Sequence, residues 1–162
     1  MRMLSKLLAV VAIGGLAGCA SIPVEEGRAP VGQMRANAEL PPSGLGPQTL
    51  APGECGLFLW SKTDTTKFIF FSRAVSGIAL FKPGNETLNL QQIAAGGTIF
   101  GQFNTEQGFA ADDGSMVELS FVPGDELTGG QRIADGLITI TDAEGWRTKL
   151  PVLGIRACMP EG

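Results

Sequence analysis

The chain has 162 residues, of which 44% are hydrophobic and 17% charged, a composition that fits one globular domain and no more. The formal net charge of -4 argues against nucleic acid as a partner, and the absence of histidine removes the commonest general base and transition-metal ligand. The 23 glycines favour a turn-rich β protein.

The first 18 residues have the features of a secretory signal peptide. Arg2 and Lys6 form a short positive region, and the apolar residues 7–18 that follow end in small side chains. A membrane-spanning helix needs about 20 apolar residues, so this segment is too short for a permanent anchor. Removal of residues 1–18 leaves a mature chain of formal charge -6, because both basic residues leave with it.

A cysteine lies at the edge of this apolar segment. Leu16, Ala17, Gly18 and Cys19 resemble the lipobox of bacterial lipoproteins. The resemblance implies that a diacylglyceryl group is attached to the Cys19 thiol, that a peptidase cuts just before Cys19 and that the new amino terminus is acylated. Two or three acyl chains hold a protein stably on a membrane, whereas one gives marginal binding. The alternative is a plain signal peptide in which Cys19 has no role.

The residue after the cysteine indicates which membrane is used. In Gram-negative lipoproteins an Asp at this position favours retention in the inner membrane, and here the position is Ala20. The resemblance therefore implies a lipid anchor in the outer membrane and a domain that faces the periplasm.

Residues 20–52 are predicted to form a flexible tether. The stretch has six of the ten prolines and few large apolar side chains. A proline-rich docking ligand within residues 39–47 is the alternative interpretation. The predicted organisation is a signal peptide (residues 1–18), a lipidated cysteine with a linker (residues 19–52) and a β domain (residues 53–162).

Short apolar runs separated by turn residues predict an all-β domain of about eight antiparallel strands. Residues 89–97 are ambiguous, because they also suit a short helical turn, and residues 123–125 (Pro-Gly-Asp) predict a turn. Such a sheet hides its edges as a β-sandwich or a small β-barrel, and we favour the sandwich. The predicted strands are residues 56–61, 67–73, 77–82, 87–93, 98–105, 116–122, 136–141 and 146–158.

The alternation of apolar and polar residues predicts which strands are covered. Val117, Leu119 and Phe121 share one face of a strand whose other face is polar, which indicates a half-exposed strand. Residues 67–71 alternate poorly, which suits a strand that is buried on both faces or covered by a neighbouring segment. Trp60 and Trp146 are expected in the core.

Two cysteines remain beyond Cys19, and they open and close the predicted domain. Cys55 and Cys158 are expected to form a disulfide, because the export compartment oxidises thiols. Their Cα atoms must then lie about 4.4 to 6.8 Å apart, with the tether leaving at the same end as the C-terminus. A redox or metal pair is the alternative, but neither a CxxC spacing nor a histidine supports it.

The sequence lacks the usual catalytic constellations. Without histidine, Ser-His-Asp and Cys-His sites are excluded, and neither a GxSxG motif nor a phosphate-binding loop is found. Asp112 and Asp113 could act as catalytic carboxylates, or as calcium ligands with Asp125 and Glu126, but a solvated turn is the better interpretation. We expect neither enzymatic activity nor a cofactor.

Two functional hypotheses follow. The first is a structural or interaction lipoprotein that binds an envelope protein through an edge strand or a sheet face. The second is a binding module, either a barrel that holds an apolar ligand or an inhibitor of an exported hydrolase. Phenylalanines in excess of what one face of a thin sheet requires motivate the second hypothesis. They are Phe68, Phe70, Phe71, Phe81, Phe100 and Phe103.

Overall fold

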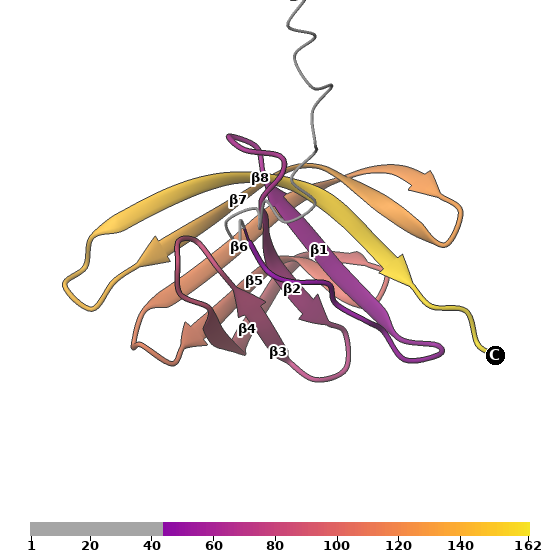
Figure 1. Cartoon of the computed structure of the whole chain (residues 1–162), viewed down its shortest axis with the longest axis horizontal. Coiled ribbons are helices and arrows are strands. Elements are labelled where there is room, and N and C mark those ends of the chain that lie inside the picture. Colours follow the sequence, from indigo (N-terminus) through magenta and orange to yellow (C-terminus); the bar gives the residue numbers. More distant parts are fainter. Residues whose placement is uncertain (1–43) are drawn as a thin grey trace, which may run out of the picture. The chain divides into compact units, whose positions relative to one another are not determined.

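A computed structural model describes residues 44–162, which form eight antiparallel strands (Figure 1). The predicted signal peptide, Cys19 and residues 20–43 of the predicted linker lie outside this range. The strands are β1 (Cys55–Ser61), β2 (Phe68–Arg73), β3 (Ile78–Phe81), β4 (Leu88–Phe100), β5 (Phe103–Ala111), β6 (Met116–Leu127), β7 (Gly130–Thr141) and β8 (Arg147–Cys158).

The strands close into a barrel in which each pairs with its neighbours in sequence, and β1 pairs with β8. The closing pair extends over the whole of β1, from Cys55 opposite Cys158 to Ser61 opposite Val152. The eight-stranded barrel confirms one of the two predicted architectures, and our preference for a sandwich is wrong. A sandwich would leave the first and last strands as edges, whereas their direct pairing removes both edges.

The barrel is filled by side chains. Phe70 is fully buried, and its ring centroid lies 6.3 Å from that of Phe81 and 5.6 Å from that of Phe109. Val117 and Leu119, from the alternating strand, are buried in the same cluster, as predicted. Apolar side chains thus occupy the interior of the barrel in place of a ligand-sized space.

A β-bulge explains the poor alternation of residues 67–71. In the pairing of β1 with β2, Leu59 lies opposite Phe70 and Trp60 lies opposite Phe68, so Ile69 of β2 is the extra residue. Ile69 and Phe70 both enter the core cluster as a result.

The segment before β1 covers part of the outer surface. The Leu45 N–H donates to the Phe68 carbonyl oxygen over 2.6 Å, and Arg73 Nη2 donates to the Thr49 carbonyl oxygen over 3.0 Å. Residues 44–52, expected in the linker, therefore belong to the barrel domain. Gly44 lies beside the start of β2, at the end of the barrel opposite Cys158, so the expectation that the tether leaves beside the C-terminus is wrong.

The strands β4, β6 and β7 extend well beyond the predicted ranges. Residues 98–105, predicted as one strand, are the hairpin between β4 and β5, which turns at Gly101 with a φ of 61°. Residues 89–97 are strand, and residues 123–125 lie within β6, where bulges absorb the Pro-Gly-Asp sequence without a turn. The 77% exposure of Trp146, before β8, contradicts its predicted place in the core.

Trp60 is half-buried on the outer face of the barrel, so its predicted core position is also wrong. Its ring centroid lies 5.1 Å from that of Phe68, and Phe58 lies 4.9 Å from Phe71 in the same way. These aromatic side chains form a small outer cluster on β1 and β2.

Candidate functional site

The two ends of the barrel differ, because one has the disulfide and most of the large exposed apolar side chains. One end, here called the disulfide end, has the start of β1, the end of β8 and the β2–β3, β4–β5 and β6–β7 hairpins. The Sγ atoms of Cys55 and Cys158 are 2.01 Å apart, so the expected disulfide is present. The Cα atoms lie 4.0 Å apart, slightly closer than we expected, because the two residues face each other directly across antiparallel strands.

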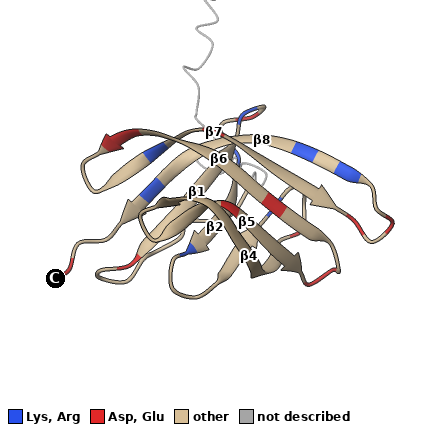
Figure 2. Ribbon diagram, turned by 180° about the vertical axis from the view of Figure 1, so that it is seen from behind, with Lys and Arg blue, Asp and Glu red and all other residues tan. Residues whose placement is uncertain are grey.

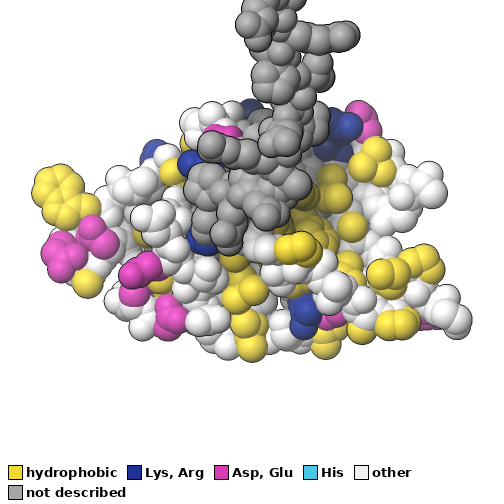
Figure 3. All heavy atoms as spheres, in the orientation of Figure 1, with side chains coloured by type: hydrophobic (Ala, Val, Ile, Leu, Met, Phe, Trp, Pro, Cys, Tyr) yellow, Lys and Arg dark blue, Asp and Glu magenta, His cyan; other side chains and the backbone are white. Residues whose placement is uncertain are grey.

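Exposed apolar side chains gather at the disulfide end. Val75 in the β2–β3 hairpin is 89% exposed, and Ile99 beside the β4–β5 hairpin is 82% exposed. The opposite end has Met116 and Trp146. Figure 3 shows hydrophobic side chains along the lower and right-hand borders of one face, and a further hydrophobic group that projects at the left border. The large exposed apolar side chains at the disulfide end are Val75, Ile78, Ile93, Ile99, Leu127 and Met159.

The distal half of β4 has a strand on one side only. β3 pairs with β4 from Ile78 opposite Gln91 to Phe81 opposite Leu88, whereas β5 pairs with β4 as far as Phe100. Among residues 44–162, no strand pairs with the β3 side of residues 93–99. We call this stretch the free edge of β4. Its backbone has no paired strand on the β3 side.

β6 has a comparable unpaired stretch, but its sequence protects it. Pairing of β5 with β6 ends at Glu106 opposite Ser120, so residues 121–127 pair with β7 alone. This stretch has Pro123, Asp125 and Glu126, whereas the free edge of β4 reads Ile-Ala-Ala-Gly-Gly-Thr-Ile, with neither charge nor proline. Proline and charge are the usual means of blocking pairing at an edge. The free edge of β4 lacks both.

A notch lies beside the free edge of β4. It has a volume of about 370 Å³ and is lined by Gly77 of the β2–β3 turn, by Ile93 and Ala95 of the free edge, and by Asn104 of β5. Arg73 also borders the notch, but its Nε lies 3.6 Å from Glu54 Oε1 and its guanidinium lies 5.6 Å from the centre of the Phe71 ring. The notch therefore leaves room next to the free edge of β4.

A carboxylate lies over the same edge. A Cβ placed on Gly96 would lie 3.3 Å from Glu106 Oε2, so the Glu106 side chain crosses the position that Gly96 leaves empty. No Lys or Arg among the described residues is within ion-pair distance of Glu106, whereas Glu118 pairs with Arg147 Nη2 over 3.3 Å. Figure 2 shows that basic and acidic residues are dispersed over the strands and loops. Glu106 is therefore a single carboxylate and not part of a larger acidic surface.

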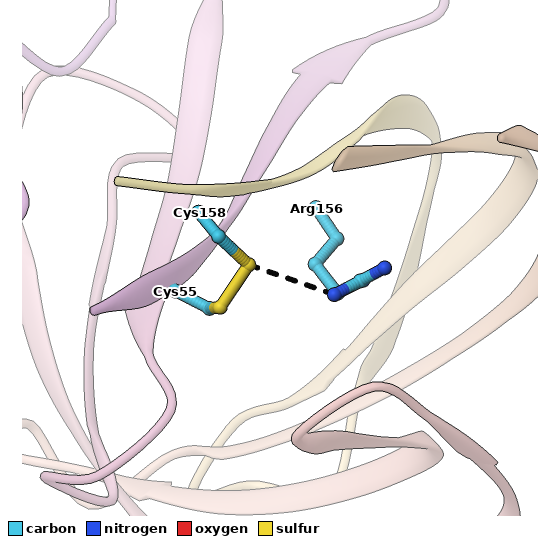
Figure 4. Close-up of a disulfide and its surroundings, with 3 residues drawn as sticks. All are labelled: Cys55, Arg156 and Cys158. Atoms are coloured by element: carbon cyan, nitrogen blue, oxygen red, sulfur yellow. Dashed lines mark hydrogen bonds between the residues drawn. A yellow bond between two sulfur atoms is a disulfide. The ribbon is translucent and has the colours of Figure 1, made fainter. Parts of the chain in front are cut away.

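Arg156 occupies the interior side of the disulfide end. Its Nη1 lies 3.6 Å from Cys158 Sγ (Figure 4). Its guanidinium lies 5.4 Å from the centre of the Phe100 ring. Gly101 approaches it so closely that a Cβ would lie 2.6 Å from Nη1. Its buried Nε has no hydrogen-bond partner. The β4–β5 hairpin covers the cation, and the Phe100 ring gives it a cation–π contact.

The four acidic residues considered as a site are not brought together. Asp112 and Asp113 lie in the β5–β6 turn, whereas Asp125 and Glu126 lie on β6 near the disulfide end. Asn89 Nδ2 donates to Asp112 Oδ2 over 2.8 Å, and this bond lowers the pKa of Asp112. In the part of the chain that the structure describes, no group of three or more Cys, Asp or Glu residues is placed to hold a metal ion.

Comparisons with known proteins return no match: no family model, no curated protein and no solved structure resembles this chain. Residues 44–162 include no helix of the length and apolarity needed to cross a membrane. The candidate site therefore depends on its geometry alone.

Sequence reasoning did not find Gly96 and Glu106 as neighbours. The predicted strands ended at residue 93 and resumed at residue 98, so the Ala-Ala-Gly-Gly stretch was left between them. The pair Gly101-Gln102 lies between two runs of residues, 93–100 and 103–109. Two runs separated by a glycine-containing pair are the signal of a hairpin, and this signal could have located the edge.

Proposed function

We propose that this protein is a lipoprotein, anchored in the outer membrane through Cys19, whose barrel domain binds another protein of the cell envelope. The anchor follows from the lipobox resemblance. The observation that carries the interaction role is the distribution of apolar side chains: the barrel interior is filled, while Val75, Ile93 and Ile99 are exposed together at the disulfide end. Exposed apolar side chains grouped in this way mark interaction surfaces.

The filled interior argues against a barrel that holds an apolar ligand. Phe70 packs against Phe81 and Phe109, Phe121 packs against Phe100, and all five rings belong to one core cluster with aliphatic residues. The excess of phenylalanines noted in the sequence is explained by this core and by the outer cluster around Phe58. A protein partner at the surface is the better proposal.

Inhibition of an exported hydrolase is the second candidate, and one feature favours it. The β4–β5 hairpin has a pairing partner on only one side of β4 and presents Ile99 at 82% exposure near its tip. A hairpin with an apolar side chain at its tip suits insertion into an enzyme cleft. The identity of the partner separates this role from a structural one.

The anchor is tested by replacing Cys19 with Ser. The hydroxyl is not alkylated by the same route, so the protein should appear in the soluble periplasmic fraction or remain unprocessed. Ser21→Ala is the matched control and should stay in the outer-membrane fraction. A Cys19→Ser chain that still fractionates with the outer membrane as mature protein would overturn the anchor.

The interaction role is tested by photo-crosslinking in intact cells. A photoreactive side chain at Ile99 should capture one specific envelope protein, whereas the same group at Trp146 should not. Both positions are highly exposed and lie at opposite ends of the barrel, so neither replacement disturbs the core. Repeated absence of a specific adduct from Ile99 and Val75 would contradict the proposed interaction role. Capture of an exported hydrolase would favour the second candidate, inhibition of that enzyme.

A further inference from the structure

We propose that the free edge of β4, residues 93–99, takes up an extended, basic segment of the partner as an added β-strand. This inference rests on the proposed interaction function and deepens it, because it names the surface and the chemistry of the segment that binds. Three features carry it: an unpaired backbone, the space beside it and one uncompensated carboxylate.

The unpaired backbone selects the conformation of the occupant. A strand edge presents N–H and C=O groups at the spacing of a strand, and an extended peptide can pair with the regular part of such a row. Between two bulges, Ala94, Ala95 and Gly96 pair regularly with Gly108, Gln107 and Glu106 of β5. This regular stretch gives an incoming strand a straight template.

Space for the added strand exists on both sides of the hairpin. The notch of about 370 Å³ borders the free edge, and a groove of about 470 Å³ lies along the β4–β6 surface. Ala94 and Ala95 line both hollows, so an added strand that alternates its side chains can place them into either one. The neighbouring β2–β3 hairpin contributes Gly77, which has no side chain to obstruct the approach.

The carboxylate of Glu106 selects the charge of the occupant. It crosses over Gly96 towards the free edge, and among the described residues it has no ion-pair partner. An added strand would lie about 4.8 Å beyond β4, so a Lys or Arg opposite Gly96 has the length to reach this carboxylate. The free edge therefore favours a basic residue at one register position.

The same carboxylate disfavours a second copy of this chain as the occupant. If two free edges paired as antiparallel neighbours around Gly96, the two Glu106 carboxylates would lie over one seam. Like charges on neighbouring strands destabilise a sheet. We therefore assign the edge to a heterologous segment.

Selection of displayed random peptides on the full chain in detergent tests the charge and the conformation. Wild-type protein should enrich peptides of alternating pattern with a Lys or Arg at a fixed position and no proline beside it. Glu106→Lys should reverse the preference to Asp or Glu, with a change of roughly fivefold in the affinity of a selected basic peptide. Glu126→Lys, on the protected stretch of β6, is the matched control and should leave the preference unchanged.

Hydrogen exchange then locates the bound peptide. Saturation with a selected basic peptide should slow exchange of backbone amides within residues 93–99 and leave those of residues 121–127 unchanged. Enriched peptides that protect another region, or whose charge preference survives Glu106→Lys, would refute the edge assignment while Ile99 crosslinking could still support the interaction function. Failure to enrich any peptide would also refute the edge assignment, and the proposed function falls only if crosslinking fails as well.

Discussion

Removal of the disulfide should leave the barrel intact and lower its stability by several kcal/mol. The double variant Cys55→Ala/Cys158→Ala deletes a bond between residues 103 positions apart in the sequence. The native state should change little, because β1 and β8 still pair from Cys55 to Ser61 without it. The main effect is on the unfolded chain, which regains the freedom of an open loop.

The size of the effect follows from the loop length. The chain-entropy model gives about 4.7 kcal/mol for a closed loop of roughly 100 residues, and measured values are often lower. With a urea slope of about 2 kcal/mol per molar, the full effect corresponds to a fall of about 2 M in the unfolding midpoint. Cys55 is buried, so the loss of its sulfur atom also lowers the stability of the variant slightly through lost packing.

Urea unfolding of three samples separates these terms: oxidised wild type, wild type reduced with a dithiol, and the double variant. The reduced wild type retains both sulfur atoms and should lose the entropic term alone. Titration of the denatured oxidised protein should find no reactive thiol from Cys55 or Cys158. A loss below about 1 kcal/mol on reduction would refute the loop argument. Loss of the β circular dichroism signal in the double variant under native conditions would show that the bond, and not strand pairing, closes the barrel.

Other substitutions test the core, the closing strands and the acidic turn. Phe70→Ala should cost roughly 3–5 kcal/mol in a chemical unfolding experiment, because the ring is fully buried, whereas Trp146→Ala should change stability by less than about 0.5 kcal/mol. Similar costs for both would contradict the assigned core. Gly154→Ala should greatly reduce the yield of folded protein, because a Cβ there would overlap the carbonyl oxygen of the closing strand; a stable variant would show that the β1–β8 contact is looser. Asn89→Ala should raise the pKa of Asp112 towards 3.8 in an NMR titration, because the variant loses the side-chain hydrogen bond that favours the carboxylate. Because the pKa of Asp112 is lower in the folded chain than in the unfolded chain, its ionisation stabilises the fold at pH values above the unfolded pKa, and this contribution is lost as the pH falls through the folded pKa. Asp112 should therefore contribute less to acid sensitivity in the variant. An unchanged Asp112 titration would refute the assignment.

Much of the strand content was accessible from the sequence, since it is a local property. The alternation around Val117 and the turn at Asp112–Gly114 predicted β6 and the turn before it, and the structure has both. The two domain cysteines were matched by elimination once Cys19 was assigned to a lipid. The anchor itself stays a prediction from the lipobox resemblance.

The candidate site was beyond sequence reasoning, because its strands are set by their partners. Residues 130–135 are mostly polar and would pass for a loop, yet they are strand because both β6 and β8 pair with them. In the same way, Ala94–Gly96 have no apolar alternation and are held as strand by β5. Propensity within a short window does not include these long-range hydrogen bonds.

The sequence by itself determined the strand periodicity and most of the turns, since each depends on residues close together in the chain. The export features stay predictions. Closure into a barrel was decided only by the tertiary structure, because it requires β1 and β8 to pair side by side from Cys55 to Ser61, and a disulfide alone is also compatible with a sandwich. The same holds for the free edge of β4. It exists because β3 has four residues while β4 has thirteen, and this mismatch leaves residues 93–99 without a paired strand on the β3 side.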